Sequence, residues 1–465
     1  MSGIPFDTIV SWLTEDRHLV DRVTVLGAPL GRMVSGACVD SRLVRPGDLF
    51  VALPGERTDG HEYVDHAVQA GASCALVCAD RLASVRPRVF GSVRLLPVDD
   101  TLAALQSVAR RWRIRFPDLV RVGVTGSNGK TSTKEMIASV LHLVSPTVAS
   151  RGNYNSDIGL PVEVLRIRDE HRYGVFELGM NRPGEISLLS GLVEPDLAII
   201  TNIGLAHVGM VGSQENIARE KRAIFSQFSG NQVAVIPAAD RYADFLAFGV
   251  NGTVVRYDMK SAGVRGVEPK GIEGSRLVCD GGTIDLHVPG AHMVTNAFAA
   301  ITALRQLGIS FAFIREGLEQ MRPVFGRSEV VRGSITVIRD CYNANPDSTR
   351  PALELLSESP TSGRRVAIIG AMKELGDESE RAHHDVYAHA TRLPIDVVWF
   401  YGDEFVAPVE GGESLHARVF RYDEWDRLVR AASKLRAGDL VLLKGSRSVA
   451  LERLTPVIVP AEVEL

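Results

Sequence analysis

The chain has 465 residues, of which 45% are hydrophobic and 23% are charged, and its net charge is −4. This composition is that of an ordinary globular protein and excludes disorder or fibrous structure for most of the chain. At roughly 150 residues per domain the length predicts about three domains, and the lack of a basic excess argues against nucleic acid as the main partner.

No segment is apolar enough over about 20 residues to predict a transmembrane helix, and the N-terminus does not resemble a secretory signal. The five cysteines are an odd number, and two of them, Cys74 and Cys78, lie in an apolar segment typical of a buried strand. A core position is favoured over a metal site for these two cysteines. The sequence therefore predicts a cytoplasmic protein with reduced thiols.

The first predicted domain comprises residues 1–118. Its secondary-structure signals are short and weak, except for a helix predicted over Leu102–Phe116. That helix ends in a run of arginines and is followed by Pro117. Cations at a helix C-terminus offset the helix dipole and a proline stops the helix, so a domain boundary is expected at residue 118.

The second predicted domain comprises residues 119–325, where apolar runs alternate with helical stretches. The runs are bounded by Gly, Pro and Asn, which is typical of buried parallel strands in a doubly wound α/β domain. A Gly-rich alternating stretch predicts an antiparallel appendage over residues 256–287. The predicted strands are Arg121–Thr125, Tyr173–Leu178, Leu197–Thr201 and Val233–Pro237.

A glycine-rich loop joins the first of these strands to a helix. Its pattern, G-x-x-G-K-T, differs from the usual P-loop, which would have glycine where this chain has Val124. Inward backbone N–H groups and a helix N-terminus nevertheless favour phosphate binding over a simple capping turn. In this interpretation Lys130 contacts the β- and γ-phosphates and Thr131 offers its hydroxyl to Mg²⁺.

Three further side chains of this region have two interpretations each. Glu177 ends a strand, where an acid commonly coordinates Mg²⁺, but a helix-capping acid fits equally well. His207 follows the next strand; a lone loop histidine is usually structural, and only its place on the same sheet edge favours a functional role. Helical periodicity over Glu215–Phe225 predicts that Lys221 is a solvated surface charge.

The third predicted domain comprises residues 326–465 and contains another α/β series. Polar residues again follow its strands, among them Asp340 and Lys444–Arg447. Ligands of open α/β sheets bind beyond the carboxyl ends of the strands, so we expect one active site between the second and third domains. The predicted strands are Ser334–Asp340, Arg365–Gly370, Ile395–Phe400 and Asp439–Lys444.

Three histidines of the third region, His383, His384 and His389, lie on a predicted helix. The cluster lacks a cysteine or a suitably placed acid, so a solvated helix face is favoured over a zinc site.

Specific motifs are spread over nearly the whole chain. Together these segments resemble the Mur ligases, the ATP-dependent amide ligases of peptidoglycan precursor synthesis, and DCYNANP, GNYN and LKGSRS resemble the branch that adds a dipeptide. The matching segments are Asp40–Leu53, Thr125–Glu135, Gly152–Pro161, Phe176–Ile186, Thr201–Gly209, Asp340–Ser348, Gly370–Ser379 and Leu442–Ser448.

The resemblance implies an α/β protein with a nucleotide-sugar domain, a central ATP domain and a Rossmann-like C-terminal domain that closes over the site. It also implies roles for individual residues. Met293 stands where many relatives have Asn, which leaves Asn296 as the adenine contact. The implied ATP site comprises Thr125, Gly126, Ser127, Asn128, Gly129, Lys130, Thr131, Ser132, Asn296, Arg327 and Asp340.

The resemblance further implies two Mg²⁺ ions, with Thr131, Glu177, His207 and a carbamate formed on Lys221 from CO₂ as their ligands. Lys130, His207 and Lys221 are the implied catalytic residues. The implied partners are UDP-N-acetylmuramoyl-tripeptide and D-alanyl-D-alanine, with no nucleic acid and no membrane span, and a monomer is expected. The implied substrate contacts are Asp40, Ser41 and Arg42 to the uridine nucleotide, Asn153 and Asn155 to the tripeptide, and Asn343 and Asn345 to the dipeptide.

In the implied reaction ATP phosphorylates the terminal carboxylate of the tripeptide, and the amine of the dipeptide attacks the resulting acyl phosphate. Two alternatives stay open at this point. One is another Mur ligase or a folylpolyglutamate synthase-like ligase, although the latter usually starts near its P-loop, which about 120 residues precede here. The other is a P-loop nucleotide switch or an ATP-binding scaffold. The chain lacks the guanine-reading N-K-x-D motif of Ras-like GTPases, which disfavours this alternative.

Overall fold

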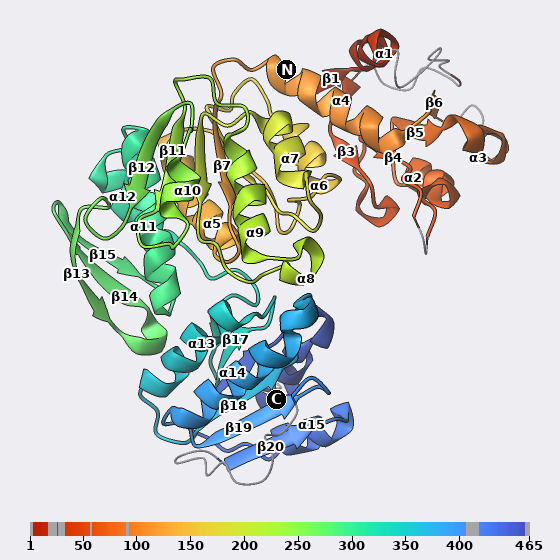
Figure 1. Ribbon diagram of the computed structural model, residues 1–465. Coiled ribbons are helices and arrows are strands. Elements are labelled where there is room, and N and C mark those ends of the chain that lie inside the picture. Colours follow the sequence, from red (N-terminus) through yellow and green to blue (C-terminus); the bar gives the residue numbers. More distant parts are fainter. Residues whose placement is uncertain are drawn as a thin grey trace, which may run out of the picture.

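The computed structural model describes residues 3–16, 26, 33–55, 58–89, 93–405 and 418–460. Its elements build three parallel or mostly parallel sheets, one after another along the chain (Figure 1). The α/β class expected from the alternating apolar runs is confirmed.

The N-terminal region contains a four-stranded parallel sheet in the order β3-β4-β5-β6. Cys74 and Cys78 are the ends of β5 and both are buried, as predicted. A short antiparallel pair, β1 with β2, lies beside this sheet. The elements are β1 (Ile4–Pro5), α1 (Phe6–Glu15), β2 (Met33–Val34), β3 (Ala37–Cys38), β4 (Leu49–Val51), α2 (Val64–Gln69), β5 (Cys74–Cys78), α3 (Leu82–Val89), β6 (Arg94–Val98) and α4 (Thr101–Ile114).

The central region contains a six-stranded parallel sheet in the order β12-β11-β10-β7-β9-β8. The four strands predicted here are confirmed. β7 lies in the interior of the sheet, between β10 and β9, and its last four residues are buried. The elements are β7 (Val120–Thr125), α5 (Lys130–Val144), β8 (Thr147–Ala149), α6 (Gly159–Val164), β9 (Tyr173–Glu177), α7 (Glu185–Val193), β10 (Leu197–Ile200), α8 (Val208–Val211), α9 (Gln214–Arg222), β11 (Val233–Pro237), α10 (Ala243–Ala247), β12 (Thr253–Tyr257), α11 (Ala291–Gln306) and α12 (Phe311–Gln320).

The predicted antiparallel appendage is present but starts later than expected. Strands β13 (Val264–Pro269), β14 (Ser275–Cys279) and β15 (Gly282–Leu286) form it. Arg256 instead belongs to β12, which pairs in parallel with β11 at the edge of the central sheet. An edge strand has a solvated side, so its alternating pattern is similar to that of the hairpins that follow.

The third region contains another six-stranded sheet, in the order β16-β17-β21-β18-β19-β20. Only β16 runs antiparallel to its neighbour. The four predicted strands are again present, within one or two residues of the expected bounds. The elements are β16 (Glu329–Val331), β17 (Thr336–Asp340), α13 (Pro346–Glu358), β18 (Arg365–Gly370), α14 (Ser379–Arg392), β19 (Val397–Tyr401), β20 (Arg418–Tyr422), α15 (Trp425–Ala432), β21 (Leu440–Lys444) and α16 (Thr455–Ile458).

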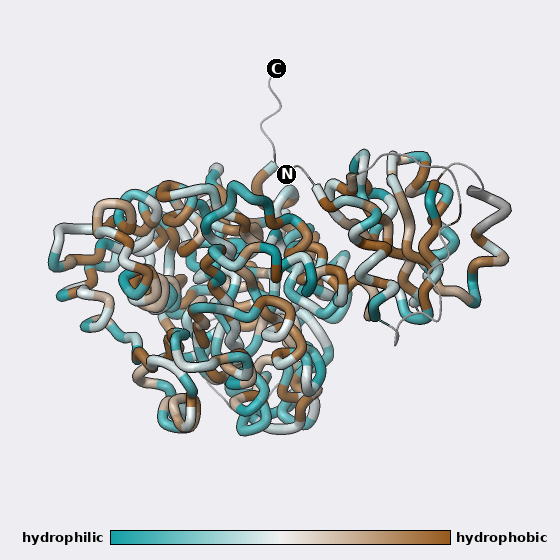
Figure 2. The backbone as a smooth tube through the Cα atoms, turned by 90° about the horizontal axis from the view of Figure 1, so that it is seen from above, coloured by the Kyte–Doolittle hydropathy of each residue, from teal (hydrophilic) through white to brown (hydrophobic). Residues whose placement is uncertain are grey.

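Helix α4 fastens the N-terminal region to the central one, and the rest of that region extends to one side (Figures 1 and 2). The indole Nε1 of Trp112 donates to the carbonyl of Ile167 at 3.1 Å. The buried Arg113 forms an ion pair with Glu194, at the end of α7. One face of α4 therefore packs against the central region, and not only against the N-terminal region.

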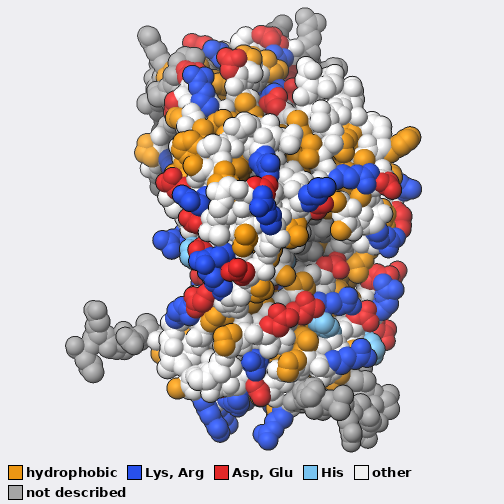
Figure 3. All heavy atoms as spheres, turned by 90° about the vertical axis from the view of Figure 1, so that its left-hand side faces the viewer, with side chains coloured by type: hydrophobic (Ala, Val, Ile, Leu, Met, Phe, Trp, Pro, Cys, Tyr) orange, Lys and Arg blue, Asp and Glu red, His pale blue; other side chains and the backbone are white. Residues whose placement is uncertain are grey.

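The predicted domain limits, 118/119 and 325/326, stay predictions. They fall between α4 and β7 and between α12 and β16, so neither cuts a regular element. Acidic and basic side chains are interspersed over the face shown in Figure 3. Among the described residues, no helix combines the length and the apolar character needed to span a bilayer.

Candidate functional site

A cavity of about 590 Å³ lies where the central region meets the third region, at the carboxyl ends of β7 and β9 on one side and of β17 and β21 on the other. The sequence predicted a site at this place, from the polar residues that follow the strands of both regions. Residues of the predicted sites that line the cavity are Ser127, Asn128, Gly129, Lys130, Ser132, Asn153, Asn155, Glu177, His207, Asn296, Arg327, Asp340 and Asn343.

The loop after β7 has glycine where other protein groups come closest. A Cβ on Gly126, whose φ is 145°, would lie 1.8 Å from Oγ1 of Thr201. A Cβ on Gly129, whose φ is 80°, would lie 2.2 Å from Oδ1 of Asn296. Only glycine fits both the backbone and the space at these positions. The tight loop places the N-terminus of α5 at the cavity.

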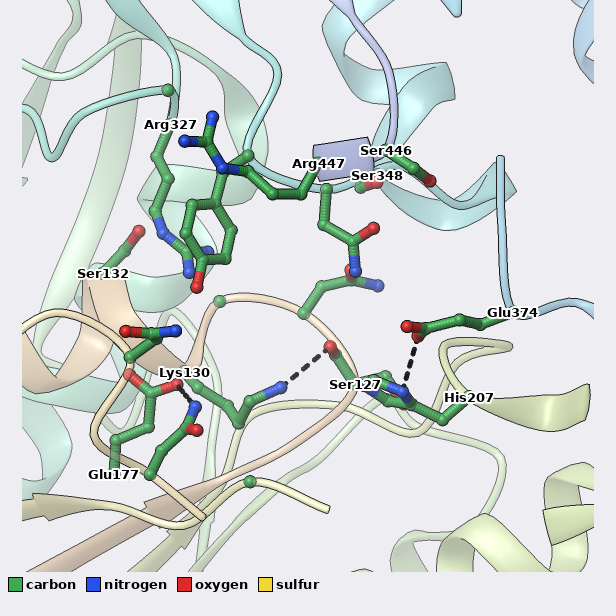
Figure 4. A pocket seen from close by; sticks show the side chains of 18 of the residues that line it. Ser127, Lys130, Ser132, Glu177, His207, Arg327, Ser348, Glu374, Ser446 and Arg447 are labelled. Carbon is green, nitrogen blue, oxygen red and sulfur yellow. Dashed lines mark hydrogen bonds and ion pairs between the residues drawn. The ribbon is translucent and has the colours of Figure 1, made fainter. Parts of the chain in front are cut away.

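Lys130 is the first residue of α5, and its ammonium group folds back over the loop. Its Nζ donates to the carbonyls of Gly126 at 2.8 Å and Ser127 at 3.2 Å (Figure 4). Burial lowers the pKa of Lys130, and the nearby guanidinium of Arg327 lowers it further, while Glu177 opposes the shift. An anionic ligand in the cavity would be attracted to these two cations.

Thr131 is in direct contact with Glu177, which lines the cavity. Thr131 Oγ1 donates to one carboxylate oxygen of Glu177 at 2.7 Å, and Asn155 Nδ2 donates to the other at 2.7 Å. Both Thr131 and Glu177 are buried. A hydroxyl beside a buried carboxylate is an oxygen donor set that fits Mg²⁺.

His207 lies in the loop after β10 and faces the third region. Its Nδ1 is 2.8 Å from a carboxylate oxygen of Glu374 (Figure 4). Both residues have positive φ, 65° for His207 and 66° for Glu374, a strained conformation for such side chains. The backbone N–H of Gly209 also donates to the Glu374 carbonyl, at 3.1 Å. His207 is thus fixed partly from across the interface.

Lys221 was predicted to be a solvated surface charge from periodicity, and this prediction is wrong. Its side chain is 1% exposed, on the inner face of α9. Burial lowers the pKa of Lys221 well below the usual lysine value, and the charge of Lys130 adds to this shift. Both effects favour the uncharged amine of Lys221 over its ammonium form, compared with a solvated lysine.

In the described residues, no group of three or more His, Cys, Asp or Glu side chains could hold a metal ion. A metal site in this cavity consequently needs a ligand of another type. Thr131 is one such donor, and a carbamate on Lys221 would be a second.

Asp340 is held at the end of β17 by two other residues of the third region. Lys444, at the end of β21, forms an ion pair with it at 2.9 Å, and the backbone N–H of Ser328 donates to its other oxygen at 3.2 Å. The guanidinium of Arg327 stacks over the ring of Tyr342, 4.1 Å from its centroid. These contacts fix a carboxylate and a cation on the wall opposite the phosphate-type loop.

The remaining predicted contacts fall in three places. Asp40 and Arg42 pair with each other in the N-terminal region, outside the cavity lining, and Ser41 between them is buried. Asn153 and Asn343 are exposed residues of the lining. Asn345 is buried and does not line the cavity; its amide is bonded to Asn128.

Several lining residues were given no role from the sequence. Lys444 and Arg447 follow one predicted strand and Lys373 follows another, which is the signal that could have found them, but the sequence does not show which of them face the cavity. His292, Tyr342 and Ser348 had no such signal.

The expected solvated face for His383, His384 and His389 is wrong for the first of them. His383 is 1% exposed; its Nε2 accepts from the Met372 N–H at 2.9 Å, and its Nδ1 lies 2.7 Å from the Ser379 carbonyl. It therefore serves as an internal support for the Gly370–Lys373 turn. Burial lowers its pKa.

Two glycines mark where the central and third regions touch most closely. A Cβ on Gly204 would lie 2.4 Å from Oδ2 of Asp347, the atom that accepts the Leu205 N–H at 2.9 Å. A Cβ on Gly209 would lie 2.5 Å from the backbone nitrogen of Gly376. We call these two pairs the docking contacts.

Gly204→Ala is expected to loosen the docked arrangement, because the added methyl group forces Asp347 away at a cost of about 1–3 kcal/mol. The expected result is a larger radius of gyration in small-angle scattering and faster amide exchange at Leu205, with an unchanged unfolding temperature for the central sheet. The control is Gly191→Ala on α7, whose new Cβ would meet nothing nearer than Gln227 at 3.9 Å. Equal scattering curves for both variants would contradict the prediction.

Family models match the chain in three consecutive stretches. Residues 34–113 match "Mur ligase family, catalytic domain", residues 124–304 match "Mur ligase middle domain", and residues 326–447 match "Mur ligase, glutamate ligase domain".

Curated proteins and solved structures agree with these matches. The UDP-N-acetylmuramoyl-tripeptide–D-alanyl-D-alanine ligase of Treponema pallidum is 41% identical, over 94% of this chain and 97% of its own. MurF from Acinetobacter baumannii superposes with a TM-score of 0.82 at 29% identity, over 98% of this chain and 99% of its own. MurF from Thermotoga maritima, solved in complex with ADP, gives 0.74 at 26% identity, over 91% and 96%. From its three matched regions and its full-length relatives, the chain belongs to the Mur ligase family.

Proposed function

We propose that this chain is an ATP-dependent amide ligase that joins D-alanyl-D-alanine to UDP-N-acetylmuramoyl-tripeptide. The observation that carries the proposal is the cavity in which the loop after β7 and the Thr131–Glu177 pair face Asp340. The names of the full-length relatives supply the substrates.

ATP is assigned to the loop Thr125–Ser132, with its phosphates beside Lys130 and the N-terminus of α5. The adenine is assigned to Asn296, whose side chain lies against Gly129 and next to the buried Met293. Arg327 is assigned to the γ-phosphate and Asp340 to the ribose. Support comes from the positions of these residues around one cavity and from the ADP complex of a relative.

The UDP-sugar is assigned to Asp40, Ser41 and Arg42 of the N-terminal domain. Its peptide would pass the Arg151–Pro161 loop, where Asn153 and Asn155 present amides, and reach the cavity. Support for that path comes from a contact between the N-terminal domain and this loop, since Gln106 Nε2 donates to the Asp157 carbonyl at 2.9 Å.

Mg²⁺ would neutralise charge on the transferring phosphoryl group, and its proposed ligands are Thr131, Glu177, His207 and a carbamate on Lys221. A carbamate forms when an uncharged amine attacks CO₂ and releases a proton, and the lowered pKa of Lys221 favours that uncharged amine. The product is an anion next to Lys130, where a second cation is disfavoured. These ligands are proposed to hold two Mg²⁺ ions.

The chemistry then follows from the residues around the cavity. A carboxylate oxygen of the tripeptide attacks the γ-phosphorus, the bond to ADP breaks, and an acyl phosphate forms. The dipeptide amine attacks the acyl carbon, loses a proton, and phosphate leaves. Lys130 and Arg327 stabilise the transferring charge, and contact between the two domains excludes the water that would hydrolyse the acyl phosphate.

We further propose three domains with limits at 118/119 and 325/326, a monomer, and a cytoplasmic location. The matched family regions fall within these limits.

The test is phosphate release by the purified chain with ATP, Mg²⁺, UDP-N-acetylmuramoyl-tripeptide and D-alanyl-D-alanine. Release is expected only when both substrates are present, with stoichiometric amide product by mass spectrometry. Release that does not depend on the dipeptide would refute the proposal, and so would nucleotide binding without turnover, the behaviour of a nucleotide switch.

A further inference from the structure

Asn345 begins helix α13 and is almost completely buried, with 2% of its surface exposed. Its Oδ1 accepts the Ser348 N–H at 3.0 Å, and its own N–H donates to Ser348 Oγ at 3.2 Å. This reciprocal pattern is a capping box, which stabilises the first turn of the helix. The capping role is local to the third domain.

The same side chain also reaches the nucleotide loop of the central domain. Asn345 Nδ2 donates to Asn128 Oδ1 at 2.8 Å, and Asn128 Nδ2 donates back to Asn345 Oδ1 at 3.3 Å. We call this the interdomain amide pair. The Oδ1 of Asn345 thus accepts two hydrogen bonds, one from each domain.

Asn128 is held rigidly from behind. Its N–H donates to Oδ1 of Asn202 at 3.0 Å, and its carbonyl accepts from Thr201 Oγ1 at 2.5 Å and from Asn202 Nδ2 at 3.0 Å. Its backbone is therefore bonded to the segment that follows β10, and its side-chain amide bonds to Asn345 of the third domain. Asn128 is two residues from Lys130, so any shift of this loop also moves the ammonium group.

A second contact joins the start of α13 to the central domain. Asp347, two residues into the same turn of α13, accepts the Leu205 N–H at 2.9 Å. The start of α13 consequently contacts both loops that follow β7 and β10. Asn343 and Ser348 line the cavity, whereas Asn345 between them does not.

We propose that Asn345 is a positioning residue that fixes the nucleotide loop against the docked third domain, and not a contact to the dipeptide. The expected effects on kcat and KM rest on the proposed function. Through Asn128, the pair holds the loop in the geometry that phosphoryl transfer requires. Loss of the pair is therefore expected to lower the rate of turnover and to leave dipeptide affinity nearly unchanged.

The experiment compares Asn345→Ser, Asn345→Ala, Asn128→Ala and the double variant Asn128→Ala/Asn345→Ser in the full chain. Serine is a good N-cap, so Asn345→Ser keeps the start of α13 but lacks the amide that reaches Asn128. Alanine at 345 removes both functions. The readouts are kcat, the KM for D-alanyl-D-alanine, the unfolding temperature, and amide hydrogen exchange over residues 126–131 without substrates.

Asn345→Ser and Asn128→Ala are each expected to lower kcat about tenfold, with less than about a twofold change in the dipeptide KM. The double variant is expected to be no worse than either single one, because both remove the same interaction. Exchange over residues 126–131 is expected to rise in all four variants. Asn345→Ser is expected to keep the unfolding temperature of the unsubstituted chain.

Three results would overturn the inference. Wild-type kcat and exchange in Asn345→Ser would leave only the capping role. A raised dipeptide KM with unchanged kcat would make Asn345 a substrate contact. Additive losses in the double variant would show that the two amides act separately. If the unsubstituted chain shows no dipeptide-dependent release, the proposed function fails, and hydrogen exchange still decides whether the pair holds the loop.

Discussion

Lys130→Met is expected to lower kcat on the order of 10³-fold, because in the proposed ATP site it removes a cation beside the transferring phosphoryl group. The fold is expected to survive. Burial lowers the pKa of Lys130, so its charged form is disfavoured, and methionine relieves that cost while losing the two bonds to loop carbonyls. The measurement is phosphate release beside the unfolding temperature, which should move by only a few degrees.

Lys260→Met is the matched control, since Lys260 is exposed and lies in the same domain, outside the cavity lining. It is expected to turn over at the rate of the unsubstituted chain. A Lys130→Met protein with more than about a tenth of normal kcat would contradict the assigned role, because a main stabiliser of transferring charge contributes more than 1.4 kcal/mol.

Lys221→Ala is expected to leave the fold intact and nearly abolish ligation, by about 10²-fold or more. In the proposed site, this variant removes the anionic oxygen ligand that a carbamate on the buried Lys221 would supply. Phosphate release measures the loss. In the unsubstituted chain, ¹³C-bicarbonate labelling should give one carbamate resonance that Lys221→Ala lacks.

A rescue experiment separates the carbamate from a packing role. Lys221→Ala leaves space into which a short carboxylic acid such as propionate can enter, and partial recovery of kcat is expected. Lys221→Met fills the same space with an apolar chain, so propionate should not restore it. Near wild-type turnover in Lys221→Ala, or equal rescue of both variants, would refute the carbamate role.

The strands and the phosphate-type loop were predictable because they depend on local sequence. Apolar runs bounded by Gly and Pro specify the buried strands, and two glycines at positive φ specify the loop. The carboxyl-edge rule then places Glu177 and Asp340 at one cavity without further information.

Other features depend on contacts between distant segments, and periodicity could not give them. Lys221 lies between two charged residues, Glu220 and Arg222, which suggests exposure to solvent. Its burial comes from the packing of α9 against α7, α8 and α10. The resemblance to the Mur ligases implied a dipeptide contact for Asn345, whereas its side chain bonds to Asn128, 217 residues away. The burial of His383 likewise depends on a contact outside its own helix, with the turn that follows β18.

The docking contacts also set a condition for recombining domains between relatives. Gly204 and Gly209 belong to the central domain, and the atoms that they approach belong to Asp347 and Gly376 of the third. A crossover near residue 325 separates the members of both pairs. A chimera therefore needs a small residue on the central side and a third domain with matching atoms in these places, even when each half folds well alone. A substitution at one position of a docking contact changes which residues fit at the other position. The two domains are therefore expected to diverge together and not as independent modules.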